Sequence, residues 1–175
     1  MKPGRGEIRP TSSRVRAAVF SMLGPDGVRD LRALDLYAGT GAFGIEALSR
    51  GAERAEFIEL DERRCLEIRL ALEMLGYGQA AKVHHGDAVK ALERLDGKFD
   101  LIFADPPYES DPFATLTGGL ERLGLLATGV WVFLEHSSRR ELPDTFAGLR
   151  LKSRRKYGDS AVSVYRPAGC LTEDR

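Results

Sequence analysis

The residues best suited to chemistry form the tetrapeptide Asp105-Pro106-Pro107-Tyr108. It directly follows the apolar run at residues 99–104, which is typical of a buried parallel strand. Because proline donates no backbone N–H and stiffens the chain, the carbonyl groups beside it are rigid acceptors. A carboxylate, a carbonyl acceptor and an aromatic ring together suit a planar substrate that carries an amino group. The alternative interpretation is a strand that ends in an ordinary proline turn.

A glycine-rich loop upstream is a second candidate site, and it follows a strand expected at residues 32–37. Gly39, Gly41 and Gly44 match the G-x-G-x-x-G spacing of dinucleotide-binding loops, in which the missing side chains let a ligand approach the backbone. Asp35 lies four residues before the first glycine, where its charge would repel a diphosphate and attract an ammonium group. This favours S-adenosylmethionine over NAD as the cofactor, with S-adenosylhomocysteine as the product.

Two further acids lie at the ends of the next two expected strands. Glu59 ends the second strand, at a distance from the glycine loop where an acid typically accepts hydrogen bonds from ribose hydroxyls. Asp87 follows the third strand and could accept a hydrogen bond from the adenine amino group. Each acid taken singly could equally be a helix N-cap or a solvated loop residue. Three acids at successive strand ends, beside one glycine loop, indicate a nucleoside-binding crevice.

The remaining chain supplies the elements that would position these residues. Apolar residues spaced i, i+3, i+4 and i+7 predict amphipathic helices, the first with Ser12 or Ser13 as its N-cap. Residues 149–157 and 161–166 predict a hairpin around Gly158-Asp159-Ser160. The alternation of strands and helices predicts an α/β fold with a mostly parallel sheet and helices on both faces. The expected helices are 13–23, 62–75, 88–95 and 112–126, with a further helix beginning near Phe43. The expected strands are 32–37, 55–60, 81–85, 99–104 and 129–135.

Composition favours a soluble globular protein, and the small number of cysteines favours a cytoplasmic setting. The 175 residues suit one domain, expected at 13–167 between a basic segment at 1–12 and a polar tail at 168–175. No apolar stretch approaches the ~20 residues that span a bilayer, and no signal peptide is recognisable. Cys65 and Cys170 have no metal-ligand spacing, so we expect neither a metal nor a disulfide. We also expect a monomer without a membrane partner.

The net charge of zero conceals two basic segments. Residues 1–16 contain five basic side chains and one acid, and residues 150–156 contain five basic side chains and no acid. Such segments favour contacts with nucleic-acid phosphates, although a solvated surface is the alternative. The candidate RNA-binding residues are Arg9, Arg14, Arg16, Arg154, Arg155 and Lys156.

Five motifs follow one another along nearly the whole chain, at residues 9–16 (RPTSSRVR), 35–41 (DLYAGTG), 57–61 (FIELD), 105–108 (DPPY) and 157–160 (YGDS). In this order they resemble the RsmD-type bacterial 16S ribosomal RNA guanine-N2 methyltransferases. The glycine loop is general to class I methyltransferases and DPPY is shared with DNA amino-methyltransferases, whereas the first and last motifs narrow the match. The resemblance implies a Rossmann-like, seven-stranded, mostly parallel sheet whose last strands form an antiparallel hairpin.

The resemblance also implies a substrate and roles for individual residues. The substrate would be one guanine, nucleotide 966 in common ribosomal numbering, in 16S ribosomal RNA, the 30S subunit or an assembly intermediate. Asp105 and the Pro106 carbonyl would accept the N–H groups of the exocyclic amine beside Pro107, and Tyr108 would stack on the extruded base. Asp35 would hold the cofactor amino group directly or through water. The expected cofactor-binding residues are Thr11, Asp35, Tyr37, Gly39, Gly41, Glu59, Leu60, Asp87 and Ala88.

Competing functions use parts of the same pattern. A DNA adenine-N6 methyltransferase would share the tetrapeptide, but it needs additional mass to read a duplex. A protein glutamine methyltransferase would more commonly carry Asn at the first position of the tetrapeptide. An RNA-binding module with a vestigial cofactor pocket is a third possibility, which the intact acids and glycine loop disfavour. Guanine and adenine both present an amino group to the same acceptors, so the sequence leaves that choice open.

Overall fold

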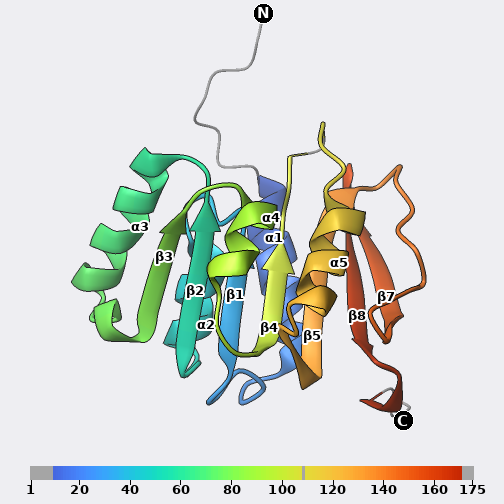
Figure 1. Cartoon of the computed structure of the whole chain (residues 1–175), viewed down its shortest axis with the longest axis horizontal. Coiled ribbons are helices and arrows are strands. Elements are labelled where there is room, and N and C mark those ends of the chain that lie inside the picture. The colour runs from blue at the N-terminus through green and yellow to red at the C-terminus, as the bar shows by residue number, and fades with distance from the viewer. Residues whose placement is uncertain (1–9, 108, 171–175) are drawn as a thin grey trace, which may run out of the picture.

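One sheet of eight strands, in the order β3-β2-β1-β4-β5-β8-β7-β6, runs through the centre of the molecule (Figure 1). The computed structural model of the chain describes residues 10–107 and 109–170. The strands are β1 (Arg32–Leu36), β2 (Arg54–Glu59), β3 (Ala81–His85), β4 (Phe99–Ala104), β5 (Leu126–Ser137), β6 (Thr145–Phe146), β7 (Leu149–Tyr157) and β8 (Ser160–Pro167).

The first five strands are parallel. β2 and β3 lie on one side of β1, and the chain then crosses to its other side to form β4 and β5. β1 pairs in parallel with both β2 and β4, so the loops that follow these two strands part on either side of it. In an open α/β sheet, such a switch point leaves a crevice at the carboxyl ends of the strands. The expected parallel sheet and its crevice are therefore confirmed.

The last three strands are antiparallel, as the hairpin signal predicts. β7 and β8 form the expected hairpin, and β8 pairs with β5. The two-residue strand β6 adds to the seven strands that were expected. It pairs with β7 through a tight turn at Ala147 and Gly148, whose φ angles of 51° and 73° are those of a hairpin turn with two left-handed residues.

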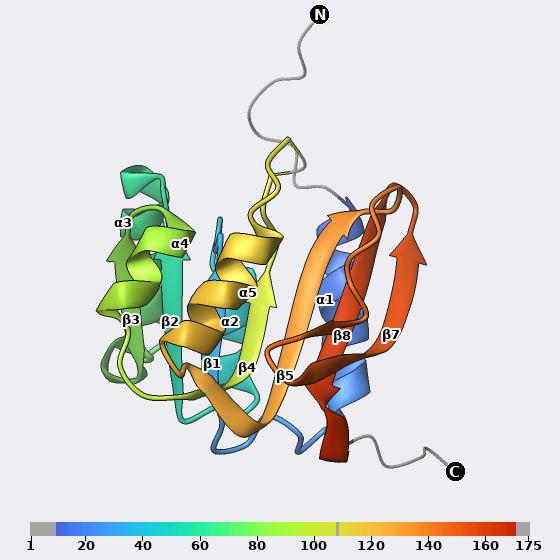
Figure 2. The same ribbon diagram turned by 45° about the vertical axis from the view of Figure 1, so that its right-hand side comes forward.

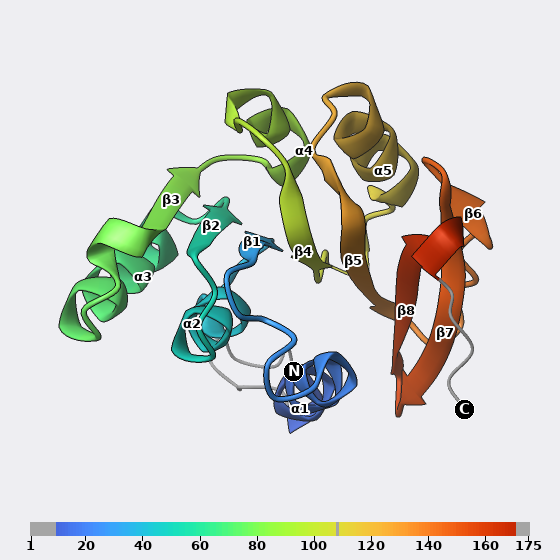
Figure 3. The same cartoon turned by 90° about the horizontal axis from the view of Figure 1, so that it is seen from below.

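Helices cover both faces of the sheet, as Figure 3 shows from below. α1, α2 and α3 lie on one face, whereas α4 and α5 cover the other, which faces forward in Figure 2. Because β4 and β5 are covered on both faces, they are apolar on both. The helices are α1 (Pro10–Leu23), α2 (Ala42–Ser49), α3 (Glu62–Met74), α4 (Ala88–Ala91) and α5 (Phe113–Arg122), with 3-10 turns at Gly78–Ala80, Leu92–Arg94 and Ala168–Cys170. Among these described elements, no helix is long and apolar enough to cross a membrane.

Several predicted helix boundaries are wrong. α1 begins at Pro10, so Ser12 and Ser13 lie inside the helix and neither is its N-cap. Proline suits the first turn of a helix, where its missing N–H costs no hydrogen bond. α5 ends at Arg122 rather than at residue 126, because Gly124 adopts a left-handed φ of 65° and donates its N–H to the Glu121 carbonyl. The helix expected at 88–95 is one α-helical turn followed by a 3-10 turn.

Candidate functional site

A cleft of about 410 Å³ opens at the carboxyl ends of the parallel strands. This volume is within the range of small-molecule sites. The cleft is built from the turns that follow β1, β2, β3 and β4, which lie side by side in the sheet. Its lining residues are Tyr37, Ile58, Glu59, Leu60, Arg64, Gly86, Asp87, Ala88, Val89, Asp105, Pro107, Ser110 and Pro112.

The glycine loop after β1 is shaped by three left-handed residues, Tyr37, Gly39 and Gly41, with φ angles of 60°, 58° and 72°. These conformations turn the chain sharply from β1 into α2, and glycine adopts them without steric cost. Gly44 has a different reason to be glycine. A Cβ atom there would lie 2.3 Å from Cε1 of the buried Phe57 ring, so its absence lets α2 pack closely against β2.

Glu59 holds this loop in place from the end of β2. Its Oε2 atom accepts the Gly39 N–H at 2.7 Å, and its Oε1 atom accepts the Asp61 N–H at 2.9 Å. The side chain is buried and also lines the cleft. Since each carboxylate oxygen has two lone pairs, these backbone bonds leave acceptor capacity for a diol.

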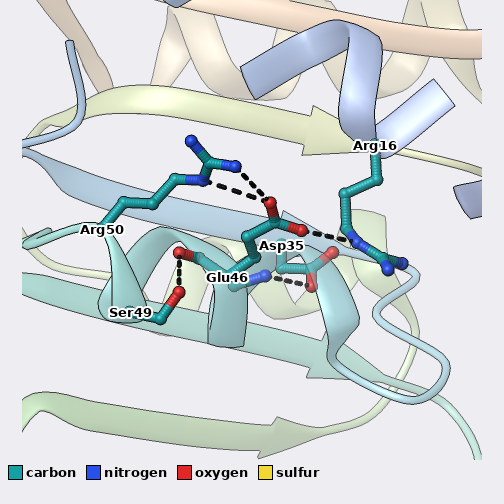
Figure 4. Close-up of polar contacts among 6 residues, drawn as sticks. Arg16, Asp35, Glu46, Ser49 and Arg50 are labelled. Carbon is teal, nitrogen blue, oxygen red and sulfur yellow. Dashed lines mark hydrogen bonds and ion pairs between the residues drawn. The ribbon is translucent and has the colours of Figure 1, made fainter. Parts of the chain in front are cut away.

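Asp35 lies beneath the glycine loop and does not line the cleft. Its carboxyl group is 2% exposed, and its Oδ2 atom accepts the Gly44 N–H at 3.0 Å (Figure 4). Burial raises the pKa of Asp35 from 3.8 to about 8, and the negative charges of Asp105 and Glu59 add to the rise. At neutral pH the free protein therefore holds this carboxyl mostly protonated. Of the two predicted contacts with a cofactor, this position favours the one through water.

Two more predicted residues, Asp87 and Tyr37, meet at the β3 side of the cleft. Asp87 is exposed and its Oδ1 atom accepts the Lys90 N–H at 3.0 Å, so it caps α4 as well as lining the cleft. Burial and the nearby charge of Asp87 raise the pKa of Tyr37 to about 12. The Tyr37 phenol thus stays neutral at physiological pH and can act as a hydrogen-bond donor.

The Asp-Pro-Pro turn forms the opposite wall. Asp105 and Pro107 line the cleft at the end of β4, while Pro106 is buried. The Pro107 carbonyl accepts hydrogen bonds from the Ser110 N–H at 3.0 Å and from the Ser110 hydroxyl at 2.9 Å, which fixes the turn. Tyr108 lies outside the described residues, as do Arg9 and the side chain of Thr11. Among the residues that the structure does describe, no three potential metal ligands come together.

The predicted RNA-binding residues fall into two groups. Arg14, Arg155 and Lys156 are exposed. Arg16 instead donates from Nε to Glu46 at 2.7 Å and joins α1 to α2 (Figure 4). Arg154 donates to the Ser163 hydroxyl at 3.1 Å and to the Leu142 carbonyl at 2.6 Å. These bonds give Arg16 and Arg154 structural roles, and their contact with RNA stays a prediction.

The structure also brings residues to the site that sequence reasoning missed. Arg64 from α3, and Ser110 and Pro112 after β4, complete the cleft lining. His136 lies beyond Pro106, buried between the Ser137 carbonyl at 2.9 Å and the Ser163 hydroxyl at 2.8 Å. Burial lowers the pKa of His136, so its ring is neutral at pH 7. None of these residues belongs to a recognisable local pattern, and only the folded topology reveals them.

Comparisons with known proteins show which family the chain belongs to. A family model described as "Conserved hypothetical protein 95" matches residues 1–166. The YlbH protein of Bacillus subtilis (strain 168) is 34% identical, over 92% of this chain and 89% of YlbH. Ribosomal RNA small subunit methyltransferase D of Escherichia coli (strain K12) is 32% identical, over 94% of this chain and 82% of that protein.

Solved structures show the same fold. A conserved hypothetical protein from Streptococcus pyogenes superimposes with a TM-score of 0.81 at 35% identity, covering 88% of this chain and 96% of that chain. The 16S ribosomal RNA methyltransferase RsmC of Thermus thermophilus, in complex with AdoMet and guanosine, gives 0.75 at 25% identity, over 94% of this chain and 44% of that chain. The chain therefore belongs to the family described as "Conserved hypothetical protein 95", in which its relatives include ribosomal RNA small subunit methyltransferase D.

Proposed function

We propose that this protein transfers a methyl group from S-adenosylmethionine to the exocyclic N2 atom of a guanine in 16S ribosomal RNA. One observation carries the proposal. Glu59 and Asp87, which follow β2 and β3, line the same cleft as Asp105 and Pro107, which follow β4. The name of the E. coli relative states an action on small-subunit ribosomal RNA, and the T. thermophilus structure contains both AdoMet and guanosine.

The β1–β3 side of the cleft suits the cofactor. Glu59 would accept hydrogen bonds from the ribose hydroxyls, and Asp87 would accept from the adenine amino group. Leu60 is 67% exposed at the cleft, so its apolar side chain offers a surface for the adenine ring opposite Ala88. Asp35 would act through a water on the ammonium group, whose charge favours the ionised carboxylate. Bound there, the cofactor supplies an electrophilic methyl group on sulfur.

The β4 side suits the methyl acceptor. An exocyclic guanine amine is a weak nucleophile, because its lone pair is delocalised into the ring. Asp105 and the Pro106 carbonyl would accept its two N–H groups, which holds the nitrogen pyramidal and turns its lone pair toward the methyl group. Positioning and electrostatics of this kind can supply much of the acceleration. Asp105 would also receive the proton released after transfer.

The exposed basic residues suit the RNA around the target. The β7–β8 turn lies at the same end of the sheet as the cleft (Figure 2). The Asp159 carbonyl in this turn accepts a hydrogen bond from the Ser138 N–H, which directly follows the carboxyl end of β5. Arg155 and Lys156 immediately precede that turn. The expected target is nucleotide 966 of 16S ribosomal RNA or of the 30S subunit or its assembly intermediates, modified by a cytoplasmic monomer.

The test is methylation of unmodified 30S subunits and of naked 16S RNA, with mass spectrometry to locate the modified nucleotide. Asp105→Asn should lower the methylation rate by at least ~100-fold, because it removes the charged acceptor. Calorimetry should show that S-adenosylmethionine still binds, since Glu59, Asp87 and the glycine loop are unchanged. Full activity of Asp105→Asn would refute this mechanism. Binding of NADH in place of S-adenosylmethionine would refute the proposed function itself.

A further inference from the structure

A second recess adjoins the cofactor cleft across the Asp-Pro-Pro turn. Pro107 and Ser110 line both spaces. The recess is narrow, with about 10 Å³ of free space. Among the described residues that line it, Arg140 alone carries a full charge, because the His136 ring is neutral at pH 7. The lining residues are Pro106, Pro107, Ser110, Phe113, His136, Ser137 and Arg140.

Arg140 spans this recess from the loop that follows β5 to the loop that follows β4. Its Nη1 atom lies 2.7 Å from Asp111 Oδ1 and donates to the Ser110 carbonyl at 3.4 Å. Its guanidinium group lies 6.0 Å from the centroid of the Phe113 ring. Arg140 also lines a separate cavity of about 260 Å³ between α5 and residues 140–146, which gives the side chain room to move.

The Asp111–Arg140 ion pair is open to exchange. The Arg140 side chain is 32% exposed and the Asp111 side chain 65% exposed. Exposed ion pairs contribute only about 0–1 kcal/mol, so another anion can displace the carboxylate at little cost. A phosphate matches the fork of a guanidinium at least as well as a carboxylate does, and it can accept two parallel hydrogen bonds. Phe113 and the Ser110 carbonyl would keep the guanidinium at the recess after Asp111 has been displaced.

We propose that Arg140 binds a backbone phosphate of the acceptor nucleotide, which takes the place of the Asp111 carboxylate. This inference rests on the proposed function, because it places the acceptor base between Arg140 and Asp105. In the free protein, Asp111 holds Arg140 across the recess and occupies the Nη1 donor that an incoming phosphate would use. Binding of the nucleotide releases this contact and opens the recess beside the turn that receives the amine. Arg140 is then a substrate-binding residue, and Asp111 is its competitor.

The test uses fluorescence anisotropy to measure binding of a fluorescein-labelled RNA stem-loop that contains the unmethylated target guanine. Arg140→Gln should raise the Kd about 10-fold. It should also reduce the slope of log Kd against log salt concentration by about one, as expected for one lost phosphate contact. Asp111→Asn should lower the Kd by about 3-fold, because it removes a competing anion. Asp111→Asn combined with Arg140→Gln should bind no better than Arg140→Gln. Arg139→Gln, which removes an exposed neighbouring charge, is the matched control and should change the Kd less than twofold.

The sign of the Asp111→Asn effect separates binding from a merely structural ion pair. If the pair only stabilises the loops, Asp111→Asn and Arg140→Gln should both weaken RNA binding, and the inference is overturned. It is also overturned if Arg140→Gln and Arg139→Gln behave alike. A stem-loop with 2-aminopurine at the target keeps the amine but lacks O6. An Arg140→Gln effect that disappears with this RNA would assign Arg140 to the base rather than to phosphate. If the wild-type protein neither binds nor methylates RNA, the proposed function fails first.

Discussion

Replacing Asp35 by Asn should stabilise the free protein, and the gain should grow as the pH rises. The carboxyl group is 2% exposed, and Asp105 and Glu59 both disfavour its negative charge. An asparagine at this position keeps an oxygen that can accept the Gly44 N–H, which now lies 3.0 Å from Asp35 Oδ2. It removes only the group that must bind a proton on folding.

The magnitude follows from the difference between the folded and unfolded pKa. The folded pKa of Asp35 is about 8 and its ordinary value is 3.8. Since the folded pKa is the higher, the stability linked to this group is fully present below pH 3.8 and is lost as the pH rises to 8. The loss amounts to about 1.4 kcal/mol per pH unit within that window. Between pH 5 and pH 7, Asp35→Asn should therefore gain about 3 kcal/mol relative to the wild type.

The assay is urea unfolding of both proteins at intervals from pH 5 to pH 9. The difference between their unfolding free energies cancels titration of groups common to both, so it should rise up to about pH 8 and then level off. A difference that stays constant with pH would show that Asp35 is ionised when the protein is folded, and would refute the reasoning. Calorimetry adds a functional readout. At pH 6.5, cofactor binding should release about one proton from the wild type and none from Asp35→Asn.

Two further predictions use matched pairs of substitutions. Gly44→Ala should lower the unfolding free energy by ~3 kcal/mol or more, because its Cβ would overlap the Phe57 ring. Gly118→Ala, which has open space around it, should raise the unfolding free energy by up to ~1 kcal/mol. Urea unfolding measures both, and equal stabilities would contradict the packing argument. Arg154→Ala should cost ~1–3 kcal/mol in the same assay through its two lost hydrogen bonds. Arg155→Ala should leave stability within ~0.5 kcal/mol and weaken RNA binding instead, and a reversed pattern would contradict these roles.

The central strands of the parallel half are readable from the sequence because they are buried on both faces. Such strands appear as short apolar runs, and the runs at 32–37 and 99–104 match β1 and β4 to within one residue. The boundaries that failed depend on single backbone conformations. Gly124 ends α5 by turning left-handed. Gly118-Gly119 lie inside that helix, although glycine pairs usually indicate a turn.

The candidate site was predictable to the extent that strand topology determines it. Acids at the ends of parallel strands must lie along one edge of the sheet, and Glu59, Asp87 and Asp105 do line one cleft. How deeply each carboxylate is buried was not predictable. Asp35 alternates along β1 with Leu34 and Leu36, which places it on the α2 face of the sheet, where it accepts the Gly44 N–H; its burial there depends on how α2 packs. Arg16 was equally unpredictable, since its partner Glu46 is 30 residues away.

Asp35 and Asp105 lie near one another but differ in burial, since Asp35 is buried and Asp105 is partly exposed, and we expect them to have different roles. A permanent charge at Asp35 would repel Glu59 and Asp105, and water could not screen it there. With a proton on Asp35, the free protein avoids this repulsion, and we expect the charge to appear only when a cationic ligand compensates it. Asp105 is partly exposed at the cleft wall, where it can remain an acceptor for an amine. A ligand without a positive charge, such as NADH, would leave Asp35 protonated, whereas a cationic ligand should favour loss of its proton, so proton release on binding distinguishes the two kinds of ligand.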